Sequence, residues 1–243
     1  MREIVLDTET TGFEPAEGDR IVEIGAIELF NHMPTGRTYH QYINPKRSMP
    51  AGAFGIHGIG PDLLEPPQDP TAGQVTLRDK PVFADVAQAF VDFVGDSKMV
   101  IHNAAFDMKF LNAELGWLNR PALPMDQALD TLGIARKKFP GSPASLDALC
   151  RRFGIDNSNR TLHGALLDSE ILAEVYLELI GGRQPDLVMA GQPAVKAKAV
   201  TQTSDWRPQA RPTPLAPKIK AAEADAHAAF IESLGENALW KKT

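Results

Sequence analysis

The stretch Ile4-Val5-Leu6-Asp7-Thr8-Glu9-Thr10-Thr11-Gly12 lies near the start of the chain and decides how the rest is interpreted. Its β-branched and apolar residues predict a buried strand, and Gly12 follows as a breaker. Because side chains alternate between the faces of a strand, Asp7 and Glu9 project from the same side. Two carboxylates that close repel each other unless a cation lies between them, and Mg²⁺ takes oxygen ligands of this kind. A polar strand end that runs into a turn is the alternative for this pair alone.

Length and composition restrict the class of protein. The chain has 243 residues, of which 43% are hydrophobic and 23% charged, which fits one domain with a tail or two small domains. The single cysteine, Cys150, excludes an internal disulfide framework and is typical of a reducing cytosol. There is neither an apolar run of about 18 residues nor a signal-peptide pattern, so we expect a cytoplasmic protein. The net charge of −6 has the wrong sign for binding nucleic acid alone through a broad basic face.

The order of strand and helix patterns predicts an α/β fold. Runs rich in β-formers indicate strands at 2–6, 21–30, 37–43 and 99–101. Apolar residues at helical spacing predict helices at 82–94, 107–117, 127–139, 145–153 and 163–179. We expect a loop or short helical turn at 53–59 and a mobile surface insertion at 65–80, which is rich in Pro, Gly, Gln and Asp. Strands first, then strands alternating with helices, imply a mixed sheet flanked by helices.

Two further carboxylate sites are expected near Asp7 and Glu9. Asp107 opens a helix directly after a strand, where ligands collect in open α/β sheets, although an acid in a first helical turn also complements the helix dipole. The other site is His163-Gly164-Ala165-Leu166-Leu167-Asp168. Its two polar residues are five positions apart, which is not a same-face spacing on a regular helix. We therefore expect His163 on the loop or first turn and Asp168 inside the helix.

Three motifs, in this order, resemble those of the DEDDh 3′–5′ exonucleases, which have an RNase H-like fold. They are 6–12, His102-Asn103-Ala104-Ala105-Phe106-Asp107 and 163–168. Within that family, Ser145-Leu146-Asp147-Ala148-Leu149-Cys150, residues 162–176 and Leu239-Trp240 resemble the proofreading epsilon subunits of bacterial DNA polymerase III. The likeness covers residues 2–182. The 65–77 insertion and the shorter loop at 12–20 depart from the epsilon pattern at the rim of the cleft and leave the motifs untouched.

The resemblance implies removal of mismatched 3′-terminal nucleotides from DNA by two-metal phosphodiester hydrolysis. It implies that two divalent ions, Mg²⁺ or Mn²⁺, are bound by Asp7, Glu9, Asp107 and Asp168, with Asp7 bridging both. His163 is then the general base, and a histidine pKa of about 6.5 suits that task at neutral pH. The residues implied to contact the terminal nucleotides are Thr10, Thr11, Gly12, Ile56, His57, Asn103 and Phe106. Core packing is the alternative role for Phe106.

The tail is expected to bind partners. Beyond residue 182 the composition shifts to Pro, Ala, Gln, Thr and Lys, which predicts a flexible linker. We expect an exonuclease domain at 1–182, a linker at 183–218 and a polymerase-binding segment at 219–243. The epsilon resemblance implies a clamp-binding motif at 184–189 with contacts from Gln184, Leu187 and Met189, although such short patterns also arise by chance. It further implies that Phe230, Leu234 and Trp240 bind the DNA polymerase III alpha subunit.

Two other functions stay open on the sequence alone. A free-standing DEDDh exonuclease acting on RNA or single-stranded DNA has no need of the tail. A non-catalytic scaffold between clamp and polymerase has no need of a complete site, yet all five catalytic and metal-binding residues are retained. The partners implied by the resemblance are single-stranded or frayed DNA 3′ ends, the alpha subunit, the sliding clamp and a small accessory subunit at the nucleoid or replisome, with no membrane.

Overall fold

The computed structural model describes residues 1–160, 162–182 and 220–234. The chain divides into two compact units, and each is considered by itself. The expected clamp contacts Gln184, Leu187 and Met189 and the expected polymerase contact Trp240 lie outside the described residues. Among the helices that are described, none is long and apolar enough to cross a membrane.

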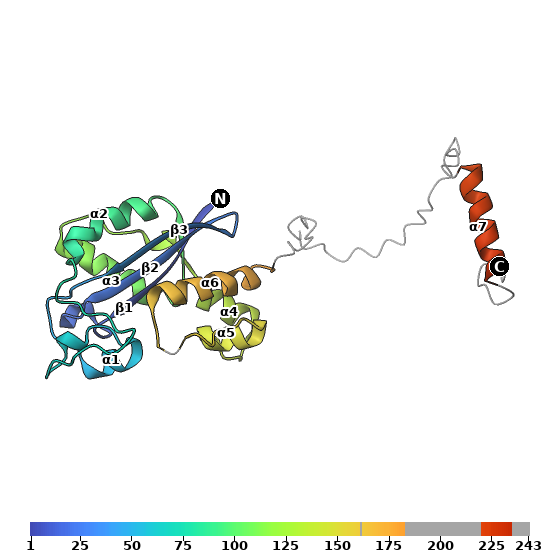
Figure 1. Ribbon diagram of the computed structural model, residues 1–243. Coiled ribbons are helices and arrows are strands. Elements are labelled where there is room, and N and C mark those ends of the chain that lie inside the picture. Colours follow the sequence, from blue (N-terminus) through green and yellow to red (C-terminus); the bar gives the residue numbers. More distant parts are fainter. Residues whose placement is uncertain (161, 183–219, 235–243) are drawn as a thin grey trace. The chain divides into compact units, whose positions relative to one another are not determined.

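A five-stranded mixed sheet forms the centre of the amino-terminal unit (Figure 1). Across the sheet the order is β3 (Met33–Tyr42), β2 (Ile21–Phe30), β1 (Arg2–Thr10), β4 (Lys98–Ile101) and β5 (Ala128–Asp130). Strand β1 is central: it pairs antiparallel with β2 and parallel with β4. The surrounding helices are α1 (Ala51–His57), α2 (Phe83–Val94), α3 (Ala104–Trp117), α4 (Thr131–Lys138), α5 (Leu146–Phe153) and α6 (Ala165–Leu179). The expected mixed sheet flanked by helices is confirmed.

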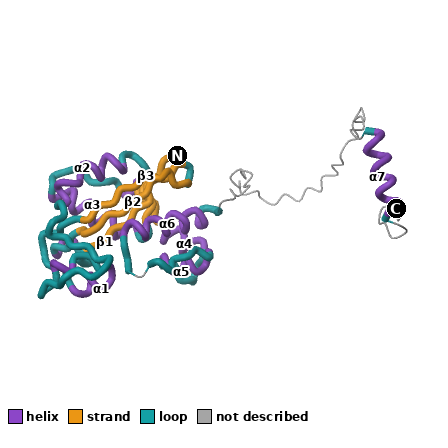
Figure 2. The backbone as a smooth tube through the Cα atoms, viewed as in Figure 1, coloured by secondary structure: helices purple, strands orange, loops and turns teal. Residues whose placement is uncertain are grey.

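Separate hydrophobic cores lie on the two faces of the sheet, and alternation along β1 assigns each of its residues to one of them. Ile4 and Leu6 pack with α2 and α3, whereas Val5 packs with α5 and α6. Figure 2 shows helices on both sides of the strands. By the same alternation Asp7 and Glu9 lie on the α6 side. Strand β1 therefore supplies acids to one face while its neighbouring positions build the core on the other.

Several elements differ from the sequence prediction. Strand β1 continues through Thr10, so Asp7 and Glu9 lie within the strand, at positions that pair with β2. Strand β3 begins at Met33, and residues 51–57 form a regular helix. Residues 127–139 are not one helix: Ala128–Asp130 form β5, which pairs with β4, and α4 begins only at Thr131. A strand of three residues is too short to produce the period-two pattern that identifies strands.

The segment 65–80 is a surface loop that is attached to the body at its carboxyl end. Residues 65–73 are exposed, as expected. Leu77 is fully buried in a small cluster with Met49, Ile59 and others. The Asp62 carboxylate accepts the backbone N–H groups of Leu77 (3.0 Å) and Arg78 (2.9 Å). The insertion is therefore anchored by a buried leucine rather than being surface along its whole length.

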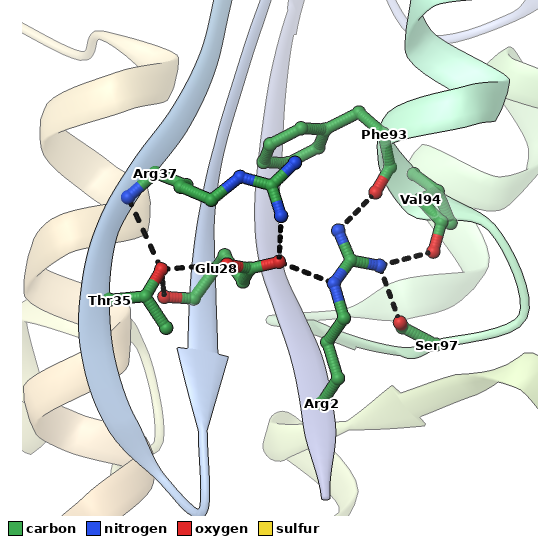
Figure 3. A network of polar contacts seen from close by, with 7 residues as sticks. All are labelled: Arg2, Glu28, Thr35, Arg37, Phe93, Val94 and Ser97. Atoms are coloured by element: carbon green, nitrogen blue, oxygen red, sulfur yellow. Dashed lines mark hydrogen bonds and ion pairs between the residues drawn. The ribbon is translucent and has the colours of Figure 1, made fainter.

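A polar network joins the edge of the sheet to the end of α2 (Figure 3). Arg2 donates to the backbone carbonyls of Phe93 (2.6 Å) and Val94 (3.1 Å) and forms an ion pair with Glu28. Arg37 donates to the same carboxylate at 2.9 Å. The hydrogen bond from Arg2 to the Glu28 carboxylate holds the pKa of Glu28 below its usual value. Because the last carbonyls of a helix lack partners within the helix, Arg2 both caps α2 and ties it to β1.

Helix α6 crosses β2 at a position where the strand has no side chain. A Cβ atom on Gly25 would lie 2.2 Å from the backbone carbon of Ala165, which no side chain can tolerate. The Ser169 hydroxyl donates to the Gly25 carbonyl at 2.9 Å. Further along the helix, the Tyr176 hydroxyl donates to the buried carboxylate of Glu3 at 2.6 Å. The helix is thus fixed against the sheet near both ends.

The carboxyl-terminal unit contains the helix α7 (Ala221–Ser233). None of its residues is buried, and Phe230 and Leu234 are 59% and 44% exposed. Since an isolated helix of this length is marginal in water, its stability must come from elsewhere. These two apolar side chains are available to a partner.

The contact at Gly25 leads to a first prediction. Gly25→Ala should lower the free energy of unfolding by about 1–3 kcal/mol, as overpacked cores do, because the added methyl forces α6 away from β2. It should also lower the nuclease activity that the sequence resemblance implies, since Asp168 moves with the helix. Chemical denaturation and single-strand degradation measure the two effects.

Gly116→Ala is the matched control, because Gly116 lies within α3 with open space around its Cα. That change should be neutral or stabilising by up to about 1 kcal/mol. Equal stability of Gly25→Ala and the parent protein would show that the helix–strand contact is not tight.

Candidate active site

Four carboxylates converge in one cavity of about 490 Å³. Asp7 and Glu9 come from β1, Asp107 from the first turn of α3 and Asp168 from the first turn of α6. His163 lines the same cavity. The three sequence motifs, which are widely separated along the chain, therefore meet at the carboxyl ends of β1 and β4, where α/β sheets commonly bind ligands.

Asp107 is positioned by the turn between β4 and α3. Asn103 adopts the left-handed conformation (φ 68°) that lets the chain reverse directly into the helix. One oxygen of Asp130 accepts the backbone N–H of Asn103 (3.0 Å) and that of Leu132 (3.1 Å), so it joins the starts of α3 and α4. Thr8 donates its hydroxyl to Asp107 at 2.7 Å. One oxygen of Asp107 is thereby held toward β1.

The first turn of α6 is positioned by Glu23 of β2. Its carboxylate accepts the backbone N–H of Ala165 at 2.9 Å and contacts the His40 imidazole at 2.6 Å. Glu23 is opposite Glu9 in the antiparallel ladder. An acid at the start of a helix satisfies a free N–H and complements the helix dipole. Because Glu23 holds the start of α6 over β2, Asp168 lies close to Glu9 on the neighbouring strand β1.

His163 lies on the loop just before α6, as expected. Its backbone N–H donates to the Ile56 carbonyl at 3.1 Å, and its side chain is about half exposed. The Nδ1 atom is 3.5 Å from an Asp168 oxygen. Desolvation lowers the pKa of His163 from 6.5, and the nearby Arg160 acts in the same direction. The neutral form of the imidazole is therefore favoured.

The carboxylates carry more negative charge than the protein neutralises. Desolvation and the neighbouring acids raise the pKa of Asp7 well above its usual value. The same causes raise the pKa of Glu9 to about 8, and desolvation raises that of Asp107 to about 7. Ligand atoms of Glu9, His163 and Asp168 lie within 4.8 Å of one another. Oxygen-rich, crowded donors of this kind fit a hard divalent cation.

Arg160 is the positive charge next to this cluster. Its guanidinium binds both oxygens of Asp168, at 2.5 and 2.7 Å. It also donates to Asp147 at 2.9 Å and to His163 Nδ1 at 3.0 Å. The Arg160 side chain is only 8% exposed.

A second cavity of about 520 Å³ adjoins the first, since Thr8, Glu9 and Phe106 line both. Of the residues expected to contact nucleotides, it is lined by Thr10, Thr11, Gly12, Ile56, His57 and Phe106. Asn103 lines neither of these two cavities and instead forms the turn before α3. Phe106 combines both of its considered roles: it packs on the core near Phe110 and presents its remaining surface to the cavities.

His57 is a neutral ring within this second cavity. Burial lowers its pKa from 6.5 to about 4. Its Nδ1 accepts the backbone N–H of Ile59 at 3.0 Å, so the proton of the neutral ring is at Nε2. His57 is therefore a hydrogen-bond donor without positive charge.

Sequence reasoning missed several residues of the site. Phe13 is 75% exposed, lines the second cavity and lies edge-on to Phe106 with ring centroids 6.4 Å apart. Glu23 and Arg160 were also missed. An arginine three positions before His163 was a usable signal, because a buried acid needs a counter-charge. For Glu23 the only signal was a charge inside a largely apolar strand.

Comparison with known proteins identifies the family. A family model described as "Exonuclease" matches residues 4–176. The DNA polymerase III subunit epsilon of Rickettsia felis is 54% identical over 187 residues, which are 76% of this chain and 76% of that protein. The Escherichia coli subunit epsilon is 48% identical over 189 residues, 75% of this chain and 72% of that protein. The chain belongs to the epsilon family of exonucleases.

Several solved structures share the fold of this chain. Exonuclease X in complex with 5′ overhanging duplex DNA superposes with a TM-score of 0.54 at 24% identity, over 73% of this chain and 90% of that one. The nuclease domain of 3′hExo, a DEDDh family member bound to rAMP, gives 0.58 at 18%, over 74% and 91%. This epsilon-family chain is a 3′–5′ exonuclease, and its fold implies dependence on divalent metal ions.

The raised pKa values lead to a prediction about the metal-free protein. Folding raises the pKa of Glu9 from 4.5 to about 8 and that of Asp107 from 3.8 to about 7, so the folded state binds more protons than the unfolded state between these limits. In EDTA the free energy of unfolding should therefore fall as pH rises from about 5 to 8. Calorimetric Tm values across this range measure it.

Two additions test the cause. Mg²⁺ should raise Tm more at pH 8 than at pH 5, because it replaces the missing counter-charge. Asp7→Asn should show a smaller loss of stability with pH, since one repelling charge is gone. A Tm that rises over this interval in EDTA would contradict the electrostatic explanation.

Proposed function

We propose that this epsilon-family exonuclease removes mismatched 3′-terminal nucleotides as the proofreading subunit of the replicative DNA polymerase, by hydrolysis that depends on two divalent ions. The observation that carries the proposal is the junction of the two cavities. One holds four carboxylates and His163, and the other combines apolar and small residues with the acids Glu9, Glu14, Glu17 and Asp19. The homology to epsilon subunits favours this role over a free-standing RNA exonuclease or a non-catalytic scaffold.

The crowded carboxylates support the following choice of metal ligands. Asp7, Glu9 and Asp168 would hold one ion, and Asp107 would support a second through Asp7, with Mg²⁺ or Mn²⁺ as candidates. When bound, such ions neutralise charge on the phosphoryl oxygens and assist the attacking and leaving oxygens. Thr8 orients Asp107 through its hydroxyl, and Glu23 orients Asp168 by capping α6.

His163 would accept the proton of the attacking water. Its ring favours the neutral form, lies on a loop and is half exposed, so it can meet a water molecule in the first cavity. In the second cavity, Phe13, Ile56 and Phe106 offer apolar surface to a nucleobase. Stacking on such a surface tolerates any base. His57 and the Thr10–Gly12 backbone offer polar groups around the sugar. Proofreading requires tolerance of this kind, since any base can be misincorporated.

The tail would connect the nuclease to its partners. We propose the exonuclease domain at 1–182, a linker at 183–218 with a clamp-binding motif at 184–189, and a polymerase-binding segment at 219–243. The exposed Phe230 and Leu234 of α7 support the last assignment. Epsilon homology supports association with the polymerase, and we extend it to the sliding clamp, to a small accessory subunit and to the replisome in the cytoplasm.

The function is tested on a primer–template with a mispaired 3′ end. With Mg²⁺ the protein should shorten the mispaired primer faster than a paired one and should cut single-stranded DNA faster than RNA of the same sequence. Asp7→Asn should abolish cutting while the protein stays folded in a thermal melt. Faster cutting of RNA, or full activity of Asp7→Asn, would overturn the proposal.

The role of His163 predicts the shape of the pH–rate profile. Because the neutral ring is the base and its pKa lies below 6.5, the rate should rise with pH on the acidic side and level off near neutrality. His163→Ala should lower kcat by about 10²–10⁴-fold and lose that limb. A profile of unchanged shape in the variant would assign the proton to another group.

The tail predicts a separation of activities. Truncation after residue 182 should leave hydrolysis of a short single strand near normal, because every residue lining the two cavities is upstream. The same truncation should abolish binding to the polymerase in a pull-down. Phe230→Ala in the full chain should weaken that binding alone, with His227→Ala on the same helix as control. Parallel loss of both activities would mean that the tail belongs to the catalytic fold.

A further inference from the structure

Arg160 occupies the part of the site where a metal ion is needed. Its guanidinium takes both oxygens of Asp168, at 2.5 and 2.7 Å. Bidentate arginine–carboxylate pairs are among the stronger hydrogen bonds in proteins. The arginine side chain and that of Asp168 are 8% and 4% exposed, so the pair is shielded from water. While this pair is intact, Asp168 has both of its oxygens engaged.

The same arginine also binds His163, the proposed general base. One of its N–H groups donates to His163 Nδ1 at 3.0 Å. Arginine has no acceptor, so Nδ1 must supply the lone pair and the neutral ring carries its proton at Nε2. A neutral imidazole has one acceptor nitrogen. In this arrangement His163 has none left for the proton of a water molecule.

We propose that Arg160 is a built-in counter-cation that keeps the metal-free site inactive. As the metal ion binds, the Arg160 guanidinium releases Asp168 and His163 and binds a phosphate oxygen of the substrate strand. The proposal rests on the proposed function, because it takes Asp168 as a metal ligand and His163 as the base. One side chain then controls two functional groups. Metal binding and readiness of the base become a single event.

The surroundings of Arg160 indicate how it moves. Asp147, whose side chain is 49% exposed, binds Arg160 at 2.9 Å from the outer side and is itself held by Asn157 at 2.9 Å. The arginine can therefore keep this outer partner while its inner N–H groups turn. It lines the cavity that holds the four carboxylates, where a phosphodiester must lie for hydrolysis. The planar fork of arginine fits phosphate and carboxylate equally well.

The test measures Mn²⁺ affinity of the full-length protein by titration calorimetry without DNA. In the parent protein Mn²⁺ must displace Arg160, and in Arg160→Gln it need not. Arg160→Gln should therefore bind Mn²⁺ about tenfold more tightly, given the usual strength of charge-assisted hydrogen bonds. Arg151→Gln is the matched control, because Arg151 is exposed on α5 and its substitution removes the same charge. Its Mn²⁺ affinity should equal that of the parent.

A second arm tests the phosphate. A phosphorothioate oligothymidylate that resists cleavage should tighten Mn²⁺ binding in the parent, because it gives Arg160 a new partner. By reciprocity Mn²⁺ tightens oligonucleotide binding to the same extent. In Arg160→Gln this mutual enhancement should be much smaller. Unchanged or weaker Mn²⁺ affinity in Arg160→Gln, or undiminished enhancement, would overturn the proposal.

Two further variants keep the outcome decisive. If Arg160→Gln does not fold, Arg160→Lys retains the charge without the bidentate fork. It should bind Mn²⁺ more tightly than the parent, and equal affinity would count against the proposal. Asp168→Asn separates the two hypotheses: if it leaves Mn²⁺ binding unaltered in the parent background, the metal assignment in the proposed function fails. If Asp168→Asn abolishes binding while Arg160→Gln changes nothing, only the role of Arg160 fails.

Discussion

The close approach of α6 to β2 at Gly25 is the constraint on which the site depends. Gly25 is opposite Asp7 in the antiparallel ladder, so the helix crosses one strand away from the first acid. The hydrogen bonds of Ser169 at Gly25 and of Tyr176 at Glu3 fix the angle and the position of the helix along the sheet. Asp168 is placed by this docking and by the Glu23 cap on Ala165, rather than by any contact with the other acids of the cavity. Backbone-to-backbone packing can place a side chain that its electrostatic neighbours repel.

That repulsion means that the site opposes the stability of the fold that carries it. Asp7, Glu9 and Asp107 are desolvated together, and neighbouring acids make Asp7 and Glu9 harder still to ionise. The hydrophobic clusters on both faces of the sheet and the network around Arg2 and Glu28 supply stability away from the cavity. Affinity for cations follows from the same strain, because a bound cation relieves it. A site of lower charge density would be more stable and would bind metal less well.

Much of this arrangement follows from the sequence. The alternation along β1 places Asp7 and Glu9 on one face, and the motifs at 102–107 and 163–168 were recognised by their resemblance to those of the DEDDh exonucleases. Strand β5 was missed because three residues do not show a period. Gly25, Glu23 and Arg160 were missed for another reason. Each acts on a residue far away in the chain or beyond a turn, and only the fold reveals which atoms a glycine brings together or which acid a buried charge will meet.

The Asp130 carboxylate has a mechanical consequence. One of its oxygens accepts N–H groups at the starts of both α3 and α4. Helix α3 carries Asp107, and α4 carries Leu132 and Arg136, which form a wall of the same cavity. Any displacement of that wall is therefore transmitted to the acid through a single shared atom. The width of the cleft and the alignment of its carboxylates are therefore coupled. A nucleic-acid strand that widens the cleft also moves Asp107 away from β1.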